Sequence, residues 1–224
     1  IWSKVQEEID ILNEHREHIY RLPGVKLPDT IEIESDLEKA CTDQDIIVFS
    51  VASPYVRSTA KEAKAFIKPG QIVVNVGKGI EEATLLPLCD VIEDEIKGAD
   101  VAVLSGPSHA EEVSKGVPTT VVVGAKTEKT AAFVQDVFMG SRFRVYTSPD
   151  IIGIELGGSL KNVIALAAGI LDGMGLGDNT RAALMTRGIA EISRLGLELG
   201  GKMETFCGLS GIGDLIVTCT STHS

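Results

Sequence analysis

A single lysine stands out in the sequence because of its surroundings. Lys161 lies in a strongly apolar segment with helical spacing, and Gly157 and Gly158 precede it. Glycine costs a helix interior about 1 kcal/mol relative to alanine, but it lets another backbone or a ligand approach closely. Apolar surroundings would lower the pKa of the lysine towards the range of a proton donor that works near neutral pH. The alternative is a lysine that snorkels from the helix edge into solvent.

A second lysine lies between two glycines. Lys78 is flanked by Gly77 and Gly79 and directly follows the apolar run 72–76, which is typical of a buried strand. Ligands of open α/β sheets bind beyond the carboxyl ends of the strands. An ammonium group beside accessible backbone N–H groups suits a phosphate. A solvated lysine in a turn explains the tripeptide equally well.

Two further turns carry polar groups. The turn 105–108 follows another apolar run. Ser108 could cap the next helix with Glu111 as its capping-box partner, or the turn could hold a substrate at the helix N-terminus. The glycine-dense turn 208–213 ends in Asp214. This carboxylate could be an N-cap, receive a substrate hydroxyl, or orient a lysine.

Other residue types point away from metal or serine-nucleophile chemistry. His15 and His18 lie three residues apart without evident further ligands, and we interpret both as surface residues and His109 as a packing or surface residue. The sequence has no GxSxG elbow. The cysteines have no CxxC spacing, so we predict no structural zinc and reduced, buried thiols at Cys41, Cys89, Cys207 and Cys219.

These groups need a scaffold that positions them. Apolar, β-branched runs predict strands covered on both faces at residues 46–49, 72–76, 101–104 and 120–123. Segments with helical spacing lie between and after them, at residues 54–67, 84–96 and 127–138. This alternation predicts an α/β fold, a Rossmann-like, doubly wound parallel sheet with helices on both faces.

The two ends of the chain differ from this pattern. Residues 1–2 are typical of the tail of a strand, Ser3 of the N-cap of a helix that runs to about His18, and residues 31–33 of an edge strand. The last third shows only long helical patterns. We therefore predict a boundary near Ser148, with one domain at residues 1–148 and an all-helical one at residues 149–224.

Composition narrows the class of partner. The chain is 44% hydrophobic and 24% charged, as in ordinary soluble globular proteins. Its formal net charge of −11 argues against nucleic acid and anionic lipid as partners. No uninterrupted apolar run approaches the roughly 20 residues that span a bilayer. We expect a cytoplasmic protein without stable membrane insertion.

Five motifs, taken in order, resemble those of one enzyme family. They are glycine-flanked Lys78, Ser-Gly-Pro-Ser at 105–108, Phe-Arg-Val-Tyr at 143–146, Leu-Lys-Asn-Val-Ile-Ala at 160–165 and Gly-Ile-Gly-Asp-Leu at 211–215. Together with residues 218–224 they are similar to successive motifs of NAD(P)-dependent glycerol-3-phosphate dehydrogenases, most closely the bacterial branch. The resemblance implies a dinucleotide-binding domain, a helical substrate domain and an active site between them. The implied reaction is reversible reduction of dihydroxyacetone phosphate to sn-glycerol 3-phosphate, which serves phospholipid synthesis.

The resemblance also implies roles for single residues. Lys161 matches the family's proton-transfer lysine, and Lys78 would meet both the cofactor and the substrate phosphate. The remaining implied contacts are Gly106, Ser108, Asp214 and Ser224 for substrate, and Tyr55 and Ala110 for the cofactor.

The cofactor preference can be predicted locally. NAD sites usually have an acidic residue at the end of the second strand, where this chain has Trp2, Ser3 and Lys4. We therefore predict a preference for NADPH over NADH, with Lys4 near the 2′-phosphate.

The chain departs from the family at both of its ends, and two alternative functions stay open. The glycine-rich phosphate turn of the family, with its strand and helix, is absent before Ile1, and the family continues beyond Ser224 with further helices. The resemblance therefore implies that both domains are incomplete. The alternatives are a related two-domain reductase of hydroxy acids or ketopantoate, and a non-catalytic nucleotide-binding module. The oligomeric state stays open, a homodimer included.

Overall fold

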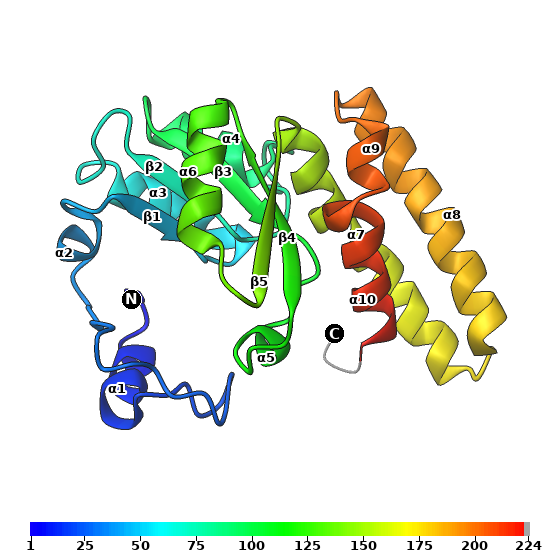
Figure 1. The fold of residues 1–224 in the computed structure, drawn as a ribbon, viewed down its shortest axis with the longest axis horizontal. Coiled ribbons are helices and arrows are strands. Elements are labelled where there is room, and N and C mark those ends of the chain that lie inside the picture. The colour runs from blue at the N-terminus through cyan, green and yellow to red at the C-terminus, as the bar shows by residue number, and fades with distance from the viewer. Residues whose placement is uncertain (222–224) are drawn as a thin grey trace.

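The structure is a computed structural model that describes residues 1–221 of the chain. It consists of a sheet unit, which carries helices on both faces, and a helical unit beside it (Figure 1). The N-terminal segment with helix α1 (Gln6–His15) lies below the sheet in this view and is not part of it.

The sheet has five strands in the order β1-β2-β3-β4-β5. Their bounds are Ile46–Phe49 for β1, Ile72–Asn75 for β2, Asp100–Ser105 for β3, Thr119–Ala125 for β4 and Phe143–Ser148 for β5. The first three strands are parallel, and β4 and β5 are parallel to each other, but β4 runs antiparallel to β3. The prediction of a wholly parallel sheet is therefore wrong at one junction.

The connection between β3 and β4 lacks a long crossover helix. It contains only the four-residue helix α5 (Ala110–Val113), which is about 6 Å long. A parallel return must cover the whole length of a six-residue strand, about 20 Å. The connection has no helix long enough to cross back over the sheet, which agrees with the antiparallel return of β4.

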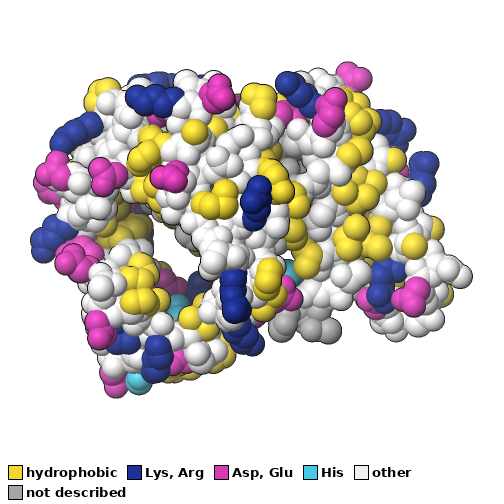
Figure 2. Space-filling model, in the orientation of Figure 1, with side chains coloured by type: hydrophobic (Ala, Val, Ile, Leu, Met, Phe, Trp, Pro, Cys, Tyr) yellow, Lys and Arg dark blue, Asp and Glu magenta, His cyan; other side chains and the backbone are white. Residues whose placement is uncertain are grey.

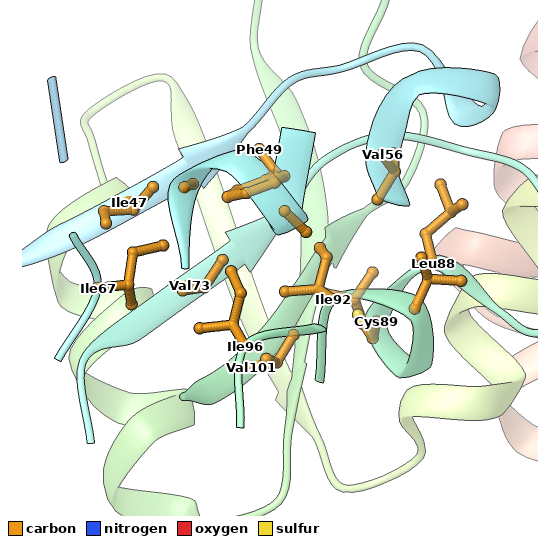
Figure 3. Packing of buried hydrophobic residues seen from close by; sticks show 14 of the residues in the cluster. Ile47, Phe49, Val56, Ile67, Val73, Leu88, Cys89, Ile92, Ile96 and Val101 are labelled. Atoms are coloured by element: carbon orange, nitrogen blue, oxygen red, sulfur yellow. The ribbon is translucent and has the colours of Figure 1, made fainter. Parts of the chain in front are cut away.

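Two apolar cores cover the two faces of the sheet. Val73 and Val101 belong to one core, which contains α3 (Val56–Ala63) and α4 (Leu88–Glu95) (Figure 3). Val74 and Ala102, their neighbours along the strands, belong to the other core, which contains α6 (Glu128–Phe138). Because successive strand residues point to opposite faces, this division confirms the doubly wound arrangement.

The N-terminal segment differs from its prediction. Helix α1 has Val5 as N-cap, without a side-chain cap, and ends where Arg16 adopts a φ of 50°. The hydroxyl of Ser3 donates instead to Glu8 Oε2 at 2.6 Å and accepts from the N–H of Val5, so Ser3 is not the N-cap. No strand forms at residues 31–33; Trp2 and Glu34 form an isolated parallel bridge, and the N-terminal amine donates to the carbonyl oxygen of Glu32 at 2.6 Å. The short helix α2 (Leu37–Cys41) follows.

The helical unit consists of two long helices and a compact end. The long helices are α7 (Ile151–Gly173) and α8 (Gly177–Glu198), and the end comprises α9 (Met203–Phe206), a π-turn at Leu209–Gly213 and α10 (Asp214–Thr220). Strand β5 ends at Ser148, but Ile154 of α7 is fully buried in the core of the sheet unit. The proposed domain boundary near Ser148 stays a prediction.

Helix α7 is long and apolar enough to cross a membrane by length and composition. It carries the buried charged residues Glu155 and Lys161, both of which bind groups within the protein. These contacts, and its packing against α8, α10 and β3, make α7 the central helix of the fold.

Candidate active site

Gly157 and Gly158 of α7 allow close approach, as predicted from the sequence. A Cβ atom on Gly157 would lie 2.6 Å from the carbonyl oxygen of Ser210 in the π-turn. A Cβ on Gly158 would lie 3.0 Å from the hydroxyl of Ser105 and 3.5 Å from the side chain of Lys78. The end of β3, the Lys78 turn and the π-turn therefore meet on this part of α7.

Lys161 lies at this meeting point and is 5% exposed. Its Nζ donates to Asp214 Oδ1 at 2.5 Å and to Thr218 Oγ1 at 2.6 Å. Asp214 is itself buried, and the hydroxyl of Thr218 donates to its carbonyl oxygen at 2.6 Å. A snorkelling lysine is excluded.

Lys78 reaches the same carboxylate from the sheet. Its Nζ donates to Asp214 Oδ2 at 2.6 Å and to the carbonyl oxygen of Gly106 at 3.4 Å. The side chain of Lys78 is 26% exposed, whereas that of Lys161 is 6% exposed. One carboxylate therefore binds two ammonium groups, and one of these is partly exposed to solvent. We call Lys78, Lys161, Asp214 and Thr218 the lysine cluster.

This arrangement changes the acidity of Lys161. Burial is the largest effect, followed by the positive charge of Lys78, and together they lower the pKa of Lys161 to about 8 although Asp214 acts in the opposite direction. An amine with this pKa exists in both protonation states close to neutral pH. Lys161 can therefore donate or accept a proton under ordinary conditions.

Asp214 has one of the three roles that the sequence left open. Helix α10 begins at Asp214, its N-cap is Gly213, and no side chain caps it. The carboxylate holds both lysines instead. Contact with a substrate hydroxyl stays a prediction.

The turn after β3 differs from the capping-box expectation. Helix α5 begins at Ala110 with His109 as N-cap and no side-chain cap. The hydroxyl of Ser108 donates to the carbonyl oxygen of Gly106 at 3.1 Å, so it does not cap the helix. Gly106 has a φ of 145°, and a Cβ there would lie 3.0 Å from Val121 Cα, which explains why the turn needs glycine.

Three of the other predicted contacts form no hydrogen bond or ion pair with the lysine cluster within the described residues. Tyr55, in the short helix at Ser53–Tyr55 after β1, is 64% exposed, and Ala110 is exposed after β3. Lys4 is exposed and forms an ion pair with Glu62 at 2.6 Å. Ser224 lies outside the described residues.

Some participants were not predicted as site residues. Thr218 lies four residues after Asp214, so both share one face of α10, and this spacing was a usable signal. Ser159 and Asn75 contact the Lys78 turn, but nothing in their local sequence indicates a role. Glu155 is a charged residue in an apolar helix, which is the same signal that identified Lys161.

Two interpretations of side-chain environment need correction. Cys207 is exposed, whereas the other three cysteines are buried, so the prediction of buried thiols is wrong for Cys207. The side chain of His18 is only 20% exposed, so this residue is partly buried and not freely exposed as expected. Among residues 1–221, no three His, Cys, Asp or Glu side chains are grouped as a metal site would require.

The matches to known proteins agree with this geometry. A family model described as "NAD-dependent glycerol-3-phosphate dehydrogenase N-terminus" matches residues 1–131, and its C-terminal counterpart matches residues 150–224. The chain is 63% identical over 224 residues to a glycerol-3-phosphate dehydrogenase [NAD(P)+] of Agathobacter rectalis and 59% identical over 225 residues to one of Moorella thermoacetica. In both comparisons all of this chain aligns with 67% of the relative.

Solved structures give the same result. The crystal structure of glycerol-3-phosphate dehydrogenase from Coxiella burnetii superposes with a TM-score of 0.96 at 36% identity, over all of this chain and 68% of that one. The enzyme from Saccharomyces cerevisiae superposes with a TM-score of 0.84 at 28% identity, over 98% of this chain and 67% of that one. The chain belongs to the NAD(P)-dependent glycerol-3-phosphate dehydrogenase family.

Proposed function

We propose that Lys161 is the proton-transfer residue of this enzyme, held by Asp214 and Thr218. The reaction of the family is the reversible, NAD(P)H-dependent reduction of dihydroxyacetone phosphate to sn-glycerol 3-phosphate. The observation that carries the proposal is the buried Lys161, whose pKa is lowered to about 8 beside a second lysine.

Lys161 would complete the reduction of the ketone. A bound nicotinamide would supply the hydride, and the former carbonyl oxygen would then need a proton. Lys161 would polarise that oxygen as an ammonium and then donate its proton to it. In the reverse direction, neutral Lys161 would accept the hydroxyl proton, and Asp214 would stabilise the ammonium that forms.

Lys78 would recognise the substrate phosphate. It is the more exposed of the two lysines, and it lies beside the glycine turns that follow β2 and β3. An ammonium with neighbouring backbone N–H groups can bind a phosphate dianion in a protein whose net charge is −11. Gly106, Ser108 and Asp214 would line the same substrate site.

The residues present also fit a dinucleotide. Tyr55, Lys78 and Ala110 follow the carboxyl ends of three adjacent parallel strands, β1, β2 and β3, so all lie at one edge of the sheet. Open α/β sheets bind nucleotides at this edge. Two open surface hollows, lined among others by Gln71 and by Ala99, lie at the opposite edge, where β2 and β3 begin. We therefore assign the cofactor to the carboxyl edge, with a preference for NADPH.

We also propose a cytoplasmic location and a role in supplying glycerol 3-phosphate for phospholipid synthesis. The family's reaction product supports this role, because glycerol 3-phosphate is the backbone of phospholipids. On the face seen in Figure 2, acidic and basic side chains are interspersed and form no single basic patch.

The test is Lys161→Ala, measured as NADPH oxidation with dihydroxyacetone phosphate. Loss of a general acid should lower kcat by about 10²- to 10⁴-fold while the circular dichroism spectrum is retained. Lys129→Ala, at an exposed lysine of α6, is the matched control and should keep full activity. A folded Lys161→Ala enzyme with normal turnover would overturn the assignment. Equal activity of the unmodified enzyme on 2-ketopantoate would favour the related reductases instead.

A further inference from the structure

The two lysines of the cluster belong to different parts of the fold. Lys161 lies on α7, whereas Lys78 lies on the turn after β2 in the sheet unit. Their shared contact with Asp214 requires that the turn keep a fixed position relative to α7. The structure shows what holds each flank of this turn.

The flank before Lys78 is fixed from within the sheet. Asn75 Oδ1 accepts from the N–H of Gly77 at 3.0 Å, and its Nδ2 donates to the carbonyl oxygen of Gly77 at 3.2 Å. Nδ2 also lies 3.4 Å from Oε1 of Glu155 on α7, and this oxygen accepts from the N–H of Cys89 at 2.9 Å. Asn75 is completely buried, so this flank is enclosed.

The flank after Lys78 is fixed by one hydroxyl. Ser159 Oγ accepts from the N–H of Gly79 at 2.9 Å and donates to the carbonyl oxygen of the same residue at 3.1 Å. On its other side Gly79 lies against Ser53, since a Cβ on Gly79 would lie 2.5 Å from Ser53 Cβ. Gly79 also has a φ of 150°, which favours glycine. Gly79 is therefore held between two serines, and within residues 1–221 only Ser159 bonds to its backbone through a side chain.

We propose that Ser159 is a positioning residue that fixes Lys78 relative to Lys161. It lies two residues before Lys161 on α7 and bonds to the residue after Lys78, so one side chain couples the two amines. Without its hydroxyl, the backbone of Gly79 loses two hydrogen bonds and the turn can shift. The shift displaces the Lys78 ammonium, and phosphate binding weakens more than proton transfer does. This inference rests on the proposed role of Lys78.

The test is a double-mutant cycle with Ser159→Ala and Lys78→Ala, assayed for dihydroxyacetone phosphate reduction. In the otherwise unmodified enzyme, Ser159→Ala should raise KM for dihydroxyacetone phosphate about tenfold with a smaller change in kcat. In the Lys78→Ala background the same substitution should have almost no further effect. Ser159→Thr, which keeps the hydroxyl, should restore most of the lost affinity.

Ser193→Ala is the matched control. Ser193 is a buried helical serine whose hydroxyl donates to the carbonyl oxygen of Ile189 at 2.7 Å, on α8. Its removal should leave KM unchanged even if the melting temperature falls as much as it does for Ser159→Ala.

The outcomes separate the two proposals. If Ser159→Ala raises KM by the same factor with and without Lys78, or leaves KM unchanged in both backgrounds, the positioning role is wrong and the role of Lys78 survives. If Lys78→Ala itself leaves KM unchanged, the proposed phosphate contact of Lys78 is wrong, and the positioning role is overturned with it.

Discussion

Two clusters of charged residues in this molecule have opposite ratios of cations to anions. In the sheet unit, Arg57 binds both oxygens of Glu81, at 2.6 and 2.8 Å, and also Asp94 and Glu95. One cation there has three anionic partners. In the lysine cluster, one anion has two cationic partners, and both Asp214 and Lys161 are buried.

The ratio of cations to anions determines whether a group in the cluster can exchange a proton near neutral pH. Hydrogen bonds from Arg57 and from Thr84 lower the pKa of Glu81 to about 2, and the carboxylates raise the pKa of Arg57 further above its ordinary value. Both shifts favour the charged forms of Arg57 and Glu81, so we interpret this cluster as structural. Around Lys161, burial and the second lysine act against the charged form. A shortage of counter-charge therefore creates a group that can exchange a proton, and an excess prevents it.

Among changes to the charge balance of the two clusters, the largest effect is expected when the lysine cluster loses its only carboxylate. Asp214→Asn should lower kcat by about 10²- to 10³-fold, because it removes the group that orients both lysines. Asp214 raises the pKa of Lys161, so its loss should lower that pKa further below about 8. Reduction needs protonated Lys161, so its rate should fall above about pH 8 in the unmodified enzyme and at a lower pH in the variant. A pH–rate series checks this, and an unshifted profile would contradict it.

A smaller effect is expected for the remaining buried charge of α7. Burial raises the pKa of Glu155 to about 7, although the N–H of Cys89 opposes the shift. Because the folded-state pKa is the higher one, the stabilisation is present below the unfolded-state value of about 4.5 and is lost as pH rises through about 7. This loss is on the order of 3 kcal/mol at most. Urea unfolding between pH 5 and pH 8 should show it, and Glu155→Gln should flatten the dependence.

An effect of intermediate size is expected for Lys4, an exposed lysine that forms an ion pair with Glu62. Lys4→Glu should raise KM for NADPH about tenfold and change KM for NADH much less, because only NADPH carries the 2′-phosphate. Glu62→Gln should act in the opposite direction, since it releases Lys4 from its ion pair. Equal changes for both cofactors would show that Lys4 does not contact the 2′-phosphate.

The smallest catalytic effect is expected in the cluster around Arg57, where carboxylates outnumber the cation. Glu81→Gln leaves Arg57 with Asp94 and Glu95, so kcat and KM should stay within about twofold of the unmodified enzyme. The melting temperature should fall, because the bidentate pair is lost. A large loss of activity in a folded protein would break the distinction between a structural and a catalytic charge cluster.

Sequence patterns predicted the elements better than their connections. The four predicted strands were confirmed because buried strands are nearly continuous runs of apolar, β-branched residues, whatever their direction. The same pattern contains no signal for direction, so the reversal of β4 was missed. The predicted helix caps at Ser3 and Ser108 were also wrong, because each hydroxyl donates a hydrogen bond to another group nearby.

By itself the sequence determined that Lys161 lies in an apolar segment with helical spacing, that two glycines precede it and that glycines flank Lys78, since these are properties of the local sequence. The family resemblance connected them to one reaction. Only the tertiary structure decided that a single carboxylate joins the two amines, that Thr218 completes the contact and that Ser159 holds the turn. Residues 78, 159 and 214 are far apart along the chain, and their distances depend on how the sheet, α7 and α10 pack together.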